Sequence, residues 1–203
     1  MPQEHYFSSK PADDDALRTV TVRLAGRELD VVTAGGVFSP AHVDLGTRVL
    51  LDGVPEPPAT GHLLDLGAGW GPIALTLGLD SPDATVWAVD VNERALDLVR
   101  RNAARLHLPH VNATMPDDVP DDVRFAAIWS NPPIRIGKAE LHELLRRWLP
   151  RLEVGATAWL VVQKNLGADS LQRWLADDLG DGWRVERAST AKGFRLLAVT
   201  REG

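Results

Sequence analysis

The chain has 203 residues, of which 44% are hydrophobic and 25% are charged, a composition typical of a globular protein with a sizeable core. It has no cysteine, which excludes disulfides, thiolate metal sites and cysteine nucleophiles. The net charge of −6 argues against a broad nucleic-acid-binding face but is compatible with a local basic patch. The first ten residues lack a signal-peptide pattern, and the longest apolar run, residues 156–162, is too short to span a membrane. We therefore expect a cytoplasmic protein.

The first 60 residues are expected to form an extension ahead of the main fold. Alternating apolar residues predict strands at 19–24 and 28–32, joined into a β-hairpin by a turn at Gly26-Arg27. A loop with two glycines, residues 35–40, precedes a predicted helix over 41–51. Residues 53–60 contain three prolines and are interpreted as a linker.

From residue 61 onward, strands and helices alternate, which predicts an α/β fold with a mostly parallel, doubly wound sheet. Helices are predicted at 72–79, 92–107, 139–149 and 170–179, and strands at 62–66, 85–89, 111–115, 125–129, 156–163, 183–187 and 194–200. The last two strands have only a short connection, so they should pair antiparallel, because a parallel crossover needs about a dozen residues. No repeat is apparent, so we expect one domain over 1–203, with an extension in 1–60 and an α/β core in 61–203.

The stretch Asp-Leu-Gly-Ala-Gly-Trp-Gly-Pro-Ile, residues 65–73, links the first core strand to the first core helix. Ligands bind at such crossovers, and Gly67 and Gly69 let the backbone approach a ligand closely. A dinucleotide fingerprint would require glycine in place of Pro72, and a Walker loop would require Gly-Lys-Ser/Thr. A buried-type Asp65 beside these glycines favours a bound small molecule over a plain turn.

Two further acidic residues follow core strands. Asp90 ends the strand at 85–89, where a carboxylate can accept hydrogen bonds from both hydroxyls of a ribose, or can help to begin the next helix. Asp117 lies just past the strand at 111–115. It can accept from a ligand or belong to a solvated acidic turn.

The sequence Ser-Asn-Pro-Pro-Ile, residues 130–134, directly follows the apolar strand at 125–129. Pro132 and Pro133 fix the backbone and remove two N–H donors. The side-chain oxygen of Asn131 and the carbonyl of Pro132 remain as rigid acceptors, which suit a substrate that offers an NH₂ group. We therefore predict a catalytic role for Asn131, Pro132, Pro133 and Ile134.

With these motifs, the sequence resembles the class I S-adenosylmethionine (SAM) methyltransferases that methylate amines. More closely, it is similar to the small-subunit ribosomal RNA guanine-N2 methyltransferase family and its short single-domain relatives. Segments throughout the chain carry the resemblance: His5-Tyr6-Phe7-Ser8, Gly36-Val37-Phe38-Ser39, Asp44-Leu45-Gly46, residues 65–72, residues 131–135 with Gly137-Lys138, Val162-Gln163-Lys164 with Gly167-Ala168, and Lys192-Gly193-Phe194.

The resemblance implies a Rossmann-like class I methyltransferase fold, with a mostly parallel seven-stranded sheet, a closing antiparallel strand and the N-terminal β-hairpin. It implies SAM as the cofactor, held by Phe38, Asp65, Gly67, Ala68, Gly69, Asp90, Val91, Asp117 and Asn131. Residues 36–39 and the His5-Tyr6 region would close over it. From the sequence pattern alone, Phe38 is as easily a core residue.

The implied reaction is methyl transfer to an exocyclic amine, with guanine N2 of 16S ribosomal RNA as the first expectation. Ribosomal RNA or the small ribosomal subunit would be the partner, contacted by Arg135, Lys138 and Lys164. The cations at 146, 147 and 151 either extend this basic rim or form a solvated helix face. No metal-ligand cluster is apparent, and we favour a monomer.

Ile134 stands where many base methyltransferases place an aromatic residue that stacks on an extruded base. An enzyme acting on a protein glutamine or a small-molecule amine therefore stays open, as does a catalytically silent SAM- or RNA-binding module.

Overall fold

The computed structural model describes residues 17–203, so the His5-Tyr6 region lies outside the described residues. Two strands precede the main sheet, β1 (Arg18–Leu24) and β2 (Arg27–Thr33), and seven form it: β3 (Thr60–Leu66), β4 (Asp83–Val89), β5 (Val111–Thr114), β6 (Phe125–Ser130), β7 (Leu152–Gln163), β8 (Trp183–Ala191) and β9 (Phe194–Arg201). The α-helices are α1 (Leu45–Gly53), α2 (Pro72–Asp80), α3 (Glu93–Arg105), α4 (Lys138–Trp148) and α5 (Ala168–Leu179).

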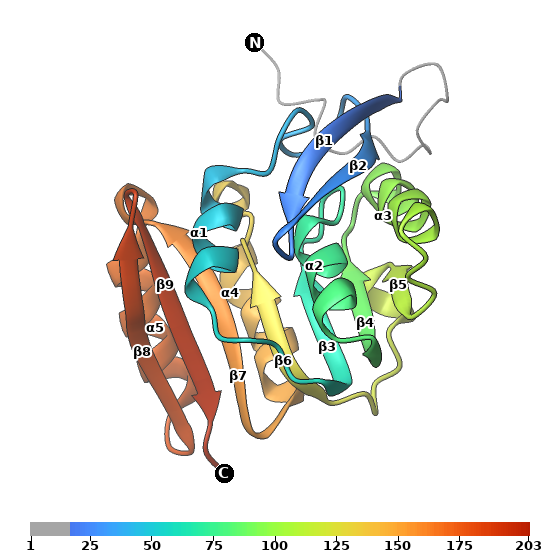
Figure 1. Cartoon of the computed structure of the whole chain (residues 1–203). Helices are drawn as coiled ribbons and strands as arrows, with labels where there is room; N and C mark the ends of the chain where they lie inside the picture. The colour runs from blue at the N-terminus through green and yellow to red at the C-terminus, as the bar shows by residue number, and fades with distance from the viewer. Residues whose placement is uncertain (1–16) are drawn as a thin grey trace.

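The main sheet has the strand order β5-β4-β3-β6-β7-β9-β8 (Figure 1). The pairs β3–β4, β4–β5, β3–β6 and β6–β7 are parallel, whereas β9 runs antiparallel to both β7 and β8. The predicted Rossmann-like architecture with a closing antiparallel strand is thereby confirmed. The strand order reverses between β3 and β6, so a crevice opens at the carboxyl ends of these two strands.

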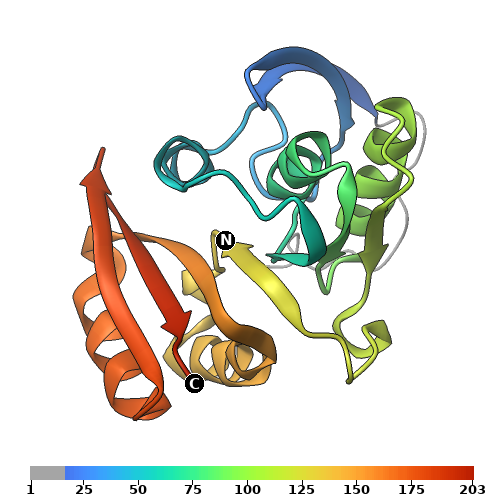
Figure 2. The same cartoon turned by 60° about the horizontal axis from the view of Figure 1, so that its bottom comes forward.

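Helices cover both faces of the sheet (Figure 2). Each face has its own core of buried side chains. Buried residues of α1, α2 and α3 belong to one core, which also includes the hairpin. Buried residues of α4 and α5 belong to the other. None of the helices in residues 17–203 has the length and apolarity needed to cross a membrane.

The predicted hairpin forms, but its turn lies one residue earlier than expected. Ala25 and Gly26, both with positive φ (48° and 71°), connect β1 and β2. Two consecutive residues with positive φ match the twist of a two-residue hairpin. Buried Asn102 on α3 then holds the hairpin: its side chain accepts from the Val32 N–H (2.7 Å) and donates to the Val32 carbonyl (2.9 Å).

One boundary error of four residues concerns α1, which begins at Leu45 instead of residue 41. Asp44 caps it, because its Oδ2 accepts from the backbone N–H groups of Gly46 (2.8 Å) and Thr47 (3.4 Å). Strands β7 and β8 are also four residues longer than predicted, at the N-terminal end of β7 and the C-terminal end of β8.

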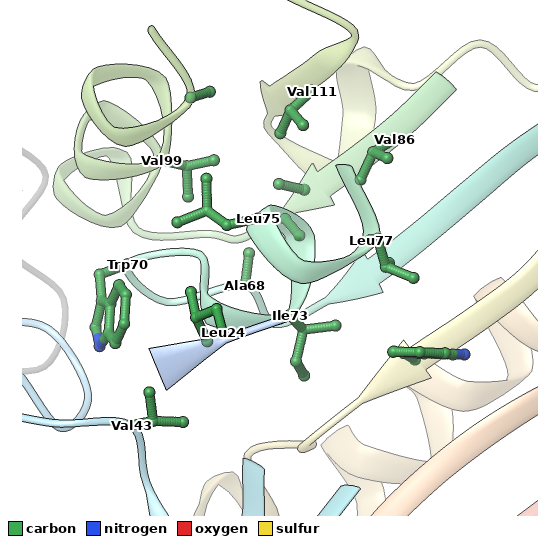
Figure 3. Close-up of a cluster of buried hydrophobic side chains, with 14 of the residues drawn as sticks. Leu24, Val43, Ala68, Trp70, Ile73, Leu75, Leu77, Val86, Val99 and Val111 are labelled. Carbon is green, nitrogen blue, oxygen red and sulfur yellow. The ribbon is translucent and has the colours of Figure 1, made fainter. Parts of the chain in front are cut away.

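The glycine turn between β3 and α2 is anchored by a large buried residue. Trp70 is 2% exposed and lies in the same core as Leu24 of β1, Val43 and Ile73 (Figure 3). Its indole Nε1 donates to the carbonyl of Ser39 (3.2 Å). The turn is therefore fixed between the hairpin, α2 and the segment that leads into α1.

Candidate active site

A small pocket, open to solvent, lies between the glycine turn and the first turn of α1. Five of the predicted site residues line it: Phe38, Gly67, Ala68, Gly69 and Asn131. Six others complete the lining: Ser39, Asp44, Thr47, Trp70, Pro72 and Ile73. The pocket thus brings together segments far apart in the sequence at the switch point of the sheet.

The glycine turn presents bare backbone to this pocket. Gly67 and Gly69 have φ of 80° and 55°, a conformation that L side chains rarely adopt. A Cβ at Gly69 would meet no atom within 4 Å, so the space beside it is open. The N–H groups of both glycines are already used in hydrogen bonds within the protein. Gly67 donates to the Val89 carbonyl (2.8 Å) and Gly69 to the Asp90 carboxylate (2.8 Å).

Asp65 lies fully buried beneath the turn and does not line the pocket. Its Oδ2 accepts from the backbone N–H of Ala74 in α2 (2.8 Å), whereas its Oδ1 is buried without a hydrogen-bond partner. Burial raises the pKa of this carboxyl to about 8; the Ala74 hydrogen bond opposes the rise and the charge of Asp90 adds to it. A buried carboxyl with an unpartnered oxygen is well suited to a cationic ligand group.

The pKa of Asp65 predicts a pH-dependent stability in the ligand-free protein. Between about pH 4 and pH 8 the folded state holds a proton that the unfolded state has released, so raising the pH favours unfolding. The contribution of Asp65 should fall by up to about 1.4 kcal/mol per pH unit in this window. Urea unfolding gives the free energy of unfolding of wild type and of Asp65→Asn at several pH values. The difference between the two plots of this free energy against pH measures the contribution of Asp65. Parallel curves would contradict the prediction.

Asp90 follows β4 and closes the other side of the turn. Its Oδ2 accepts from the Gly69 N–H, and its Oδ1 accepts from the Asn92 N–H (2.9 Å). Desolvation raises its pKa, against the effect of these backbone donors. Asn92, and not Asp90, caps α3, through Arg94 N–H (3.0 Å). Val91, next in the chain, is exposed. Asp90 therefore joins the turn to β4 and retains lone pairs for a ligand.

The side-chain amide of Asn131 is held from one side. Its Nδ2 donates to Asp44 Oδ2 (3.0 Å) and to Thr47 Oγ1 (3.1 Å). Both amide hydrogens are thereby used within the protein, and the amide oxygen remains as the acceptor beside the pocket. Ser130 fixes the end of β6, because its buried hydroxyl donates to the Leu66 carbonyl (2.6 Å).

The two prolines form a tight turn. Pro133 has φ −74° and ψ 74°, and the Ile134 N–H donates to the Pro132 carbonyl (2.8 Å), which is an inverse γ-turn. The Pro132 carbonyl therefore already accepts one hydrogen bond and has one lone pair left. Pro132 is buried, and Ile134 is partly buried against the core of α4 and α5.

Several predicted residues do not line the pocket. Asp117 is exposed and forms an ion pair with Arg147 (2.8 Å), so its role as a cofactor contact stays a prediction. Lys138 and Lys164 are exposed at the starts of α4 and of the turn after β7. The side chain of Arg135 lies outside the described part of the structure.

The helical arginines contact the protein itself. Arg146 pairs with Asp178, and Arg151 donates to the carbonyls of Val123 and Pro120. These contacts favour the interpretation of a solvated helix face over a phosphate-binding rim.

The contact of Thr47 with the site is not predictable from the sequence. Thr47 lies within the helix predicted over 41–51, where its sequence context indicates no function, yet its hydroxyl accepts from Asn131, 84 residues away. The Asp44-Leu45-Gly46 segment was noticed, but no function was assigned to it. Among residues 17–203, no group of three or more His, Cys, Asp or Glu side chains is arranged to hold a metal ion.

Comparison with known proteins agrees with this geometry. The chain is 38% identical over 201 residues to the uncharacterised protein YbxB of Bacillus subtilis (strain 168), covering 98% of both chains. It is 38% identical over 196 residues to ribosomal RNA small subunit methyltransferase C of Ectopseudomonas mendocina (strain ymp), covering 93% of this chain and 56% of that protein.

A structural relative is the T. thermophilus 16S rRNA N2 methyltransferase RsmC in complex with AdoMet and guanosine, with a TM-score of 0.76 and 22% identity. The match covers 93% of this chain and 51% of that one, so the chain spans about half the length of the methyltransferase C relatives that it matches. The family model for the methyltransferase small domain matches residues 28–198. The protein therefore belongs to the methyltransferase small domain family.

Proposed function

We propose that this methyltransferase transfers a methyl group from SAM to an exocyclic amine, namely N2 of guanine in 16S ribosomal RNA. The observation that carries the proposal is the state of Asn131. Its amide hydrogens are bound by Asp44 and Thr47, so its oxygen is the group offered beside the pocket. An oxygen acceptor fixed in this way suits a substrate NH₂ group.

The described residues fit SAM. The open space at Gly69 admits a ligand against bare backbone, and Asp90 can accept from a ribose. Asp65 is buried beneath the turn with its Oδ1 unpartnered, so it would act on the cationic amino end through water or through the backbone of the turn. Phe38 is 46% exposed and lines the pocket, as a wall residue would. Bound SAM supplies a methyl group on a positively charged sulfur.

The protein's own part is to orient the substrate. The oxygen of Asn131 would accept one hydrogen of the amino group, and the remaining lone pair of the Pro132 carbonyl is available for the other. Orientation of this kind lowers the activation free energy of many enzymatic reactions by several kcal/mol. In the best cases the reduction is roughly 7 kcal/mol or more. No strong base is required, because the proton can pass to solvent once the nitrogen carries the methyl group.

Support for an RNA substrate comes from two of the relatives reported above, which are named as small-subunit ribosomal RNA methyltransferases. Ile134 supports an alternative, a protein glutamine or small-molecule amine, because it cannot stack on a base as an aromatic residue would. Its partial burial against the core leaves an apolar contact only.

Methyl transfer from labelled SAM to ribosomal RNA and to 30S subunits, taken from cells that lack this protein, tests the proposal. Nucleoside analysis should find N2-methylguanosine, and Asn131→Ala should form it at least about 100-fold more slowly. Absence of label from RNA, with SAM binding intact, would contradict the RNA substrate, and label in protein would favour the alternative.

Lys138 and Lys164 are expected to contact RNA phosphates. Replacing both by alanine should weaken substrate binding and reduce the slope of log affinity against log salt by about 0.7 for each contact to a single strand. The control is Arg187→Ala, an exposed cation on the edge strand β8. The affinity for RNA, measured at several salt concentrations for wild type and both variants, tests this prediction. An unchanged slope in the double variant would exclude both lysines from the interface.

A further inference from the structure

We infer that Asp44 and Thr47, at the start of α1, are positioning residues that set the orientation of the Asn131 amide for catalysis. The inference rests on the proposed function and extends it. Neither residue belongs to the glycine turn or to the Asn-Pro-Pro loop. Both are brought to the site by a helix that lies outside the 61–203 core, through contacts that span 87 and 84 residues of sequence.

The charge of Asp44 decides which end of the amide faces α1. An ionised carboxylate only accepts hydrogen bonds. If the Asn131 amide were turned over, its oxygen would face Asp44 Oδ2 at about the same separation of 3.0 Å, and two acceptors would repel each other. Asp44 therefore admits the NH₂ end alone and directs the oxygen away.

Thr47 supplies the second contact. Its Oγ1 accepts from the same Nδ2 at 3.1 Å, and its side chain is almost fully buried at 4% exposed. Two acceptors on one amide nitrogen fix both the side-chain dihedral and the plane of the amide. A buried hydroxyl on the first turn of a capped helix is a rigid acceptor, since Asp44 Oδ2 also accepts from the N–H groups of Gly46 and Thr47.

Gly46, between the two residues, shows how closely this contact is packed. A Cβ there would lie 3.2 Å from Asn131 Nδ2, 3.0 Å from Asp44 Oδ2 and 2.9 Å from Phe194 of β9. Any side chain at this position would therefore push the amide or the capping carboxylate away. Within the segment 44–47, Asp44 caps α1, Gly46 allows a close approach to Asn131, and Thr47 accepts a hydrogen bond from the Asn131 amide.

This arrangement also strengthens the catalytic acceptor. A hydrogen bond from the Asn131 NH₂ group to a carboxylate polarises the amide and places more negative charge on its oxygen. The oxygen then holds an NH₂ hydrogen of the substrate more strongly. We therefore expect Asp44 and Thr47 to affect kcat through Asn131.

Thr47→Val is the discriminating variant, because valine keeps the shape and removes the acceptor. We expect kcat to fall by about 5- to 10-fold, as for the loss of one hydrogen bond that orients a reacting group. The Kd of SAM and the KM of the RNA should stay within about twofold. Thr47→Ser, which restores a hydroxyl, should recover most of the activity.

Asp44→Asn separates charge from capping, since asparagine caps helices as well as aspartate does. The variant should therefore fold with the same α1 and still lose kcat by about 10-fold or more. A change in the KM of the RNA in place of kcat would assign Asp44 to direct substrate contact and overturn the positioning role.

A readout independent of activity keeps the two proposals distinct. The side-chain NH₂ resonances of Asn131, assigned by their absence in Asn131→Ala, should differ from those of a free amide in wild type and move toward free values in Thr47→Val. Unchanged resonances, or changed resonances with full kcat, would overturn the positioning role. If wild type methylates no guanine N2 while these resonances behave as expected, the proposed substrate fails and the restraint on Asn131 stands.

Discussion

Asn131→Ala is expected to lower kcat for methyl transfer by at least about 100-fold, while the Kd of SAM changes by less than about threefold. The variant removes the acceptor that orients the substrate amino group, and loss of one preorganised polar contact at a reacting centre typically costs on the order of 100- to 1,000-fold. Single-turnover rates at saturating SAM, together with calorimetric titration of SAM, measure the two quantities separately.

The control for this experiment is the thermal stability of the variant. Asn131 is only partly buried, but its removal leaves Asp44 Oδ2 and Thr47 Oγ1 without one donor. Asp44 still accepts from two backbone N–H groups of α1, so a modest destabilisation of about 1 kcal/mol is expected. A large loss of SAM affinity in a folded variant would contradict the substrate-orienting role of Asn131 and leave only the cofactor contact that the resemblance implies.

Local motifs in the sequence were sufficient to predict the architecture and part of the site. Gly67, Gly69 and Asn131 line one pocket because a glycine turn after β3 and a loop after β6 meet wherever two parallel strands are neighbours. The antiparallel pairing of β8 and β9 followed from the short connection between them. Such features depend on residues that are close in the chain, so their pattern is visible without a structure.

Contacts between segments that are distant in the chain could not be predicted from the sequence. Thr47 carries no motif of its own, and its importance comes only from the placement of α1 against the loop after β6. Asp117 was proposed as a ligand contact, yet in the structure it pairs with Arg147 of α4. The start of α1 was misplaced because the apolar periodicity runs on through residues 41–44, and only the geometry of Asp44 identifies the true cap.

Asp90→Ala is expected to produce the opposite result to Asn131→Ala. The Kd of SAM should rise by about 30- to 100-fold, because hydrogen bonds to a charged group contribute about 1.5–3 kcal/mol. Two effects combine in this variant. The ribose acceptor is removed, and the Gly69 N–H, which Asp90 Oδ2 holds at 2.8 Å, loses its partner, so the turn that faces the cofactor is loosened.

Calorimetric titration of SAM gives the affinity, and turnover at saturating SAM, which should stay within about threefold of wild type, gives the rate. Asp97→Ala is the matched control, because Asp97 lies on the adjoining helix α3 and pairs with Arg101 at 2.9 Å, outside the pocket lining. Asp90→Asn should bind SAM with intermediate affinity, since its amide oxygen retains one acceptor. If Asp90→Ala left the Kd unchanged and reduced kcat instead, Asp90 would act on the substrate, and its assignment as a cofactor ligand would be wrong.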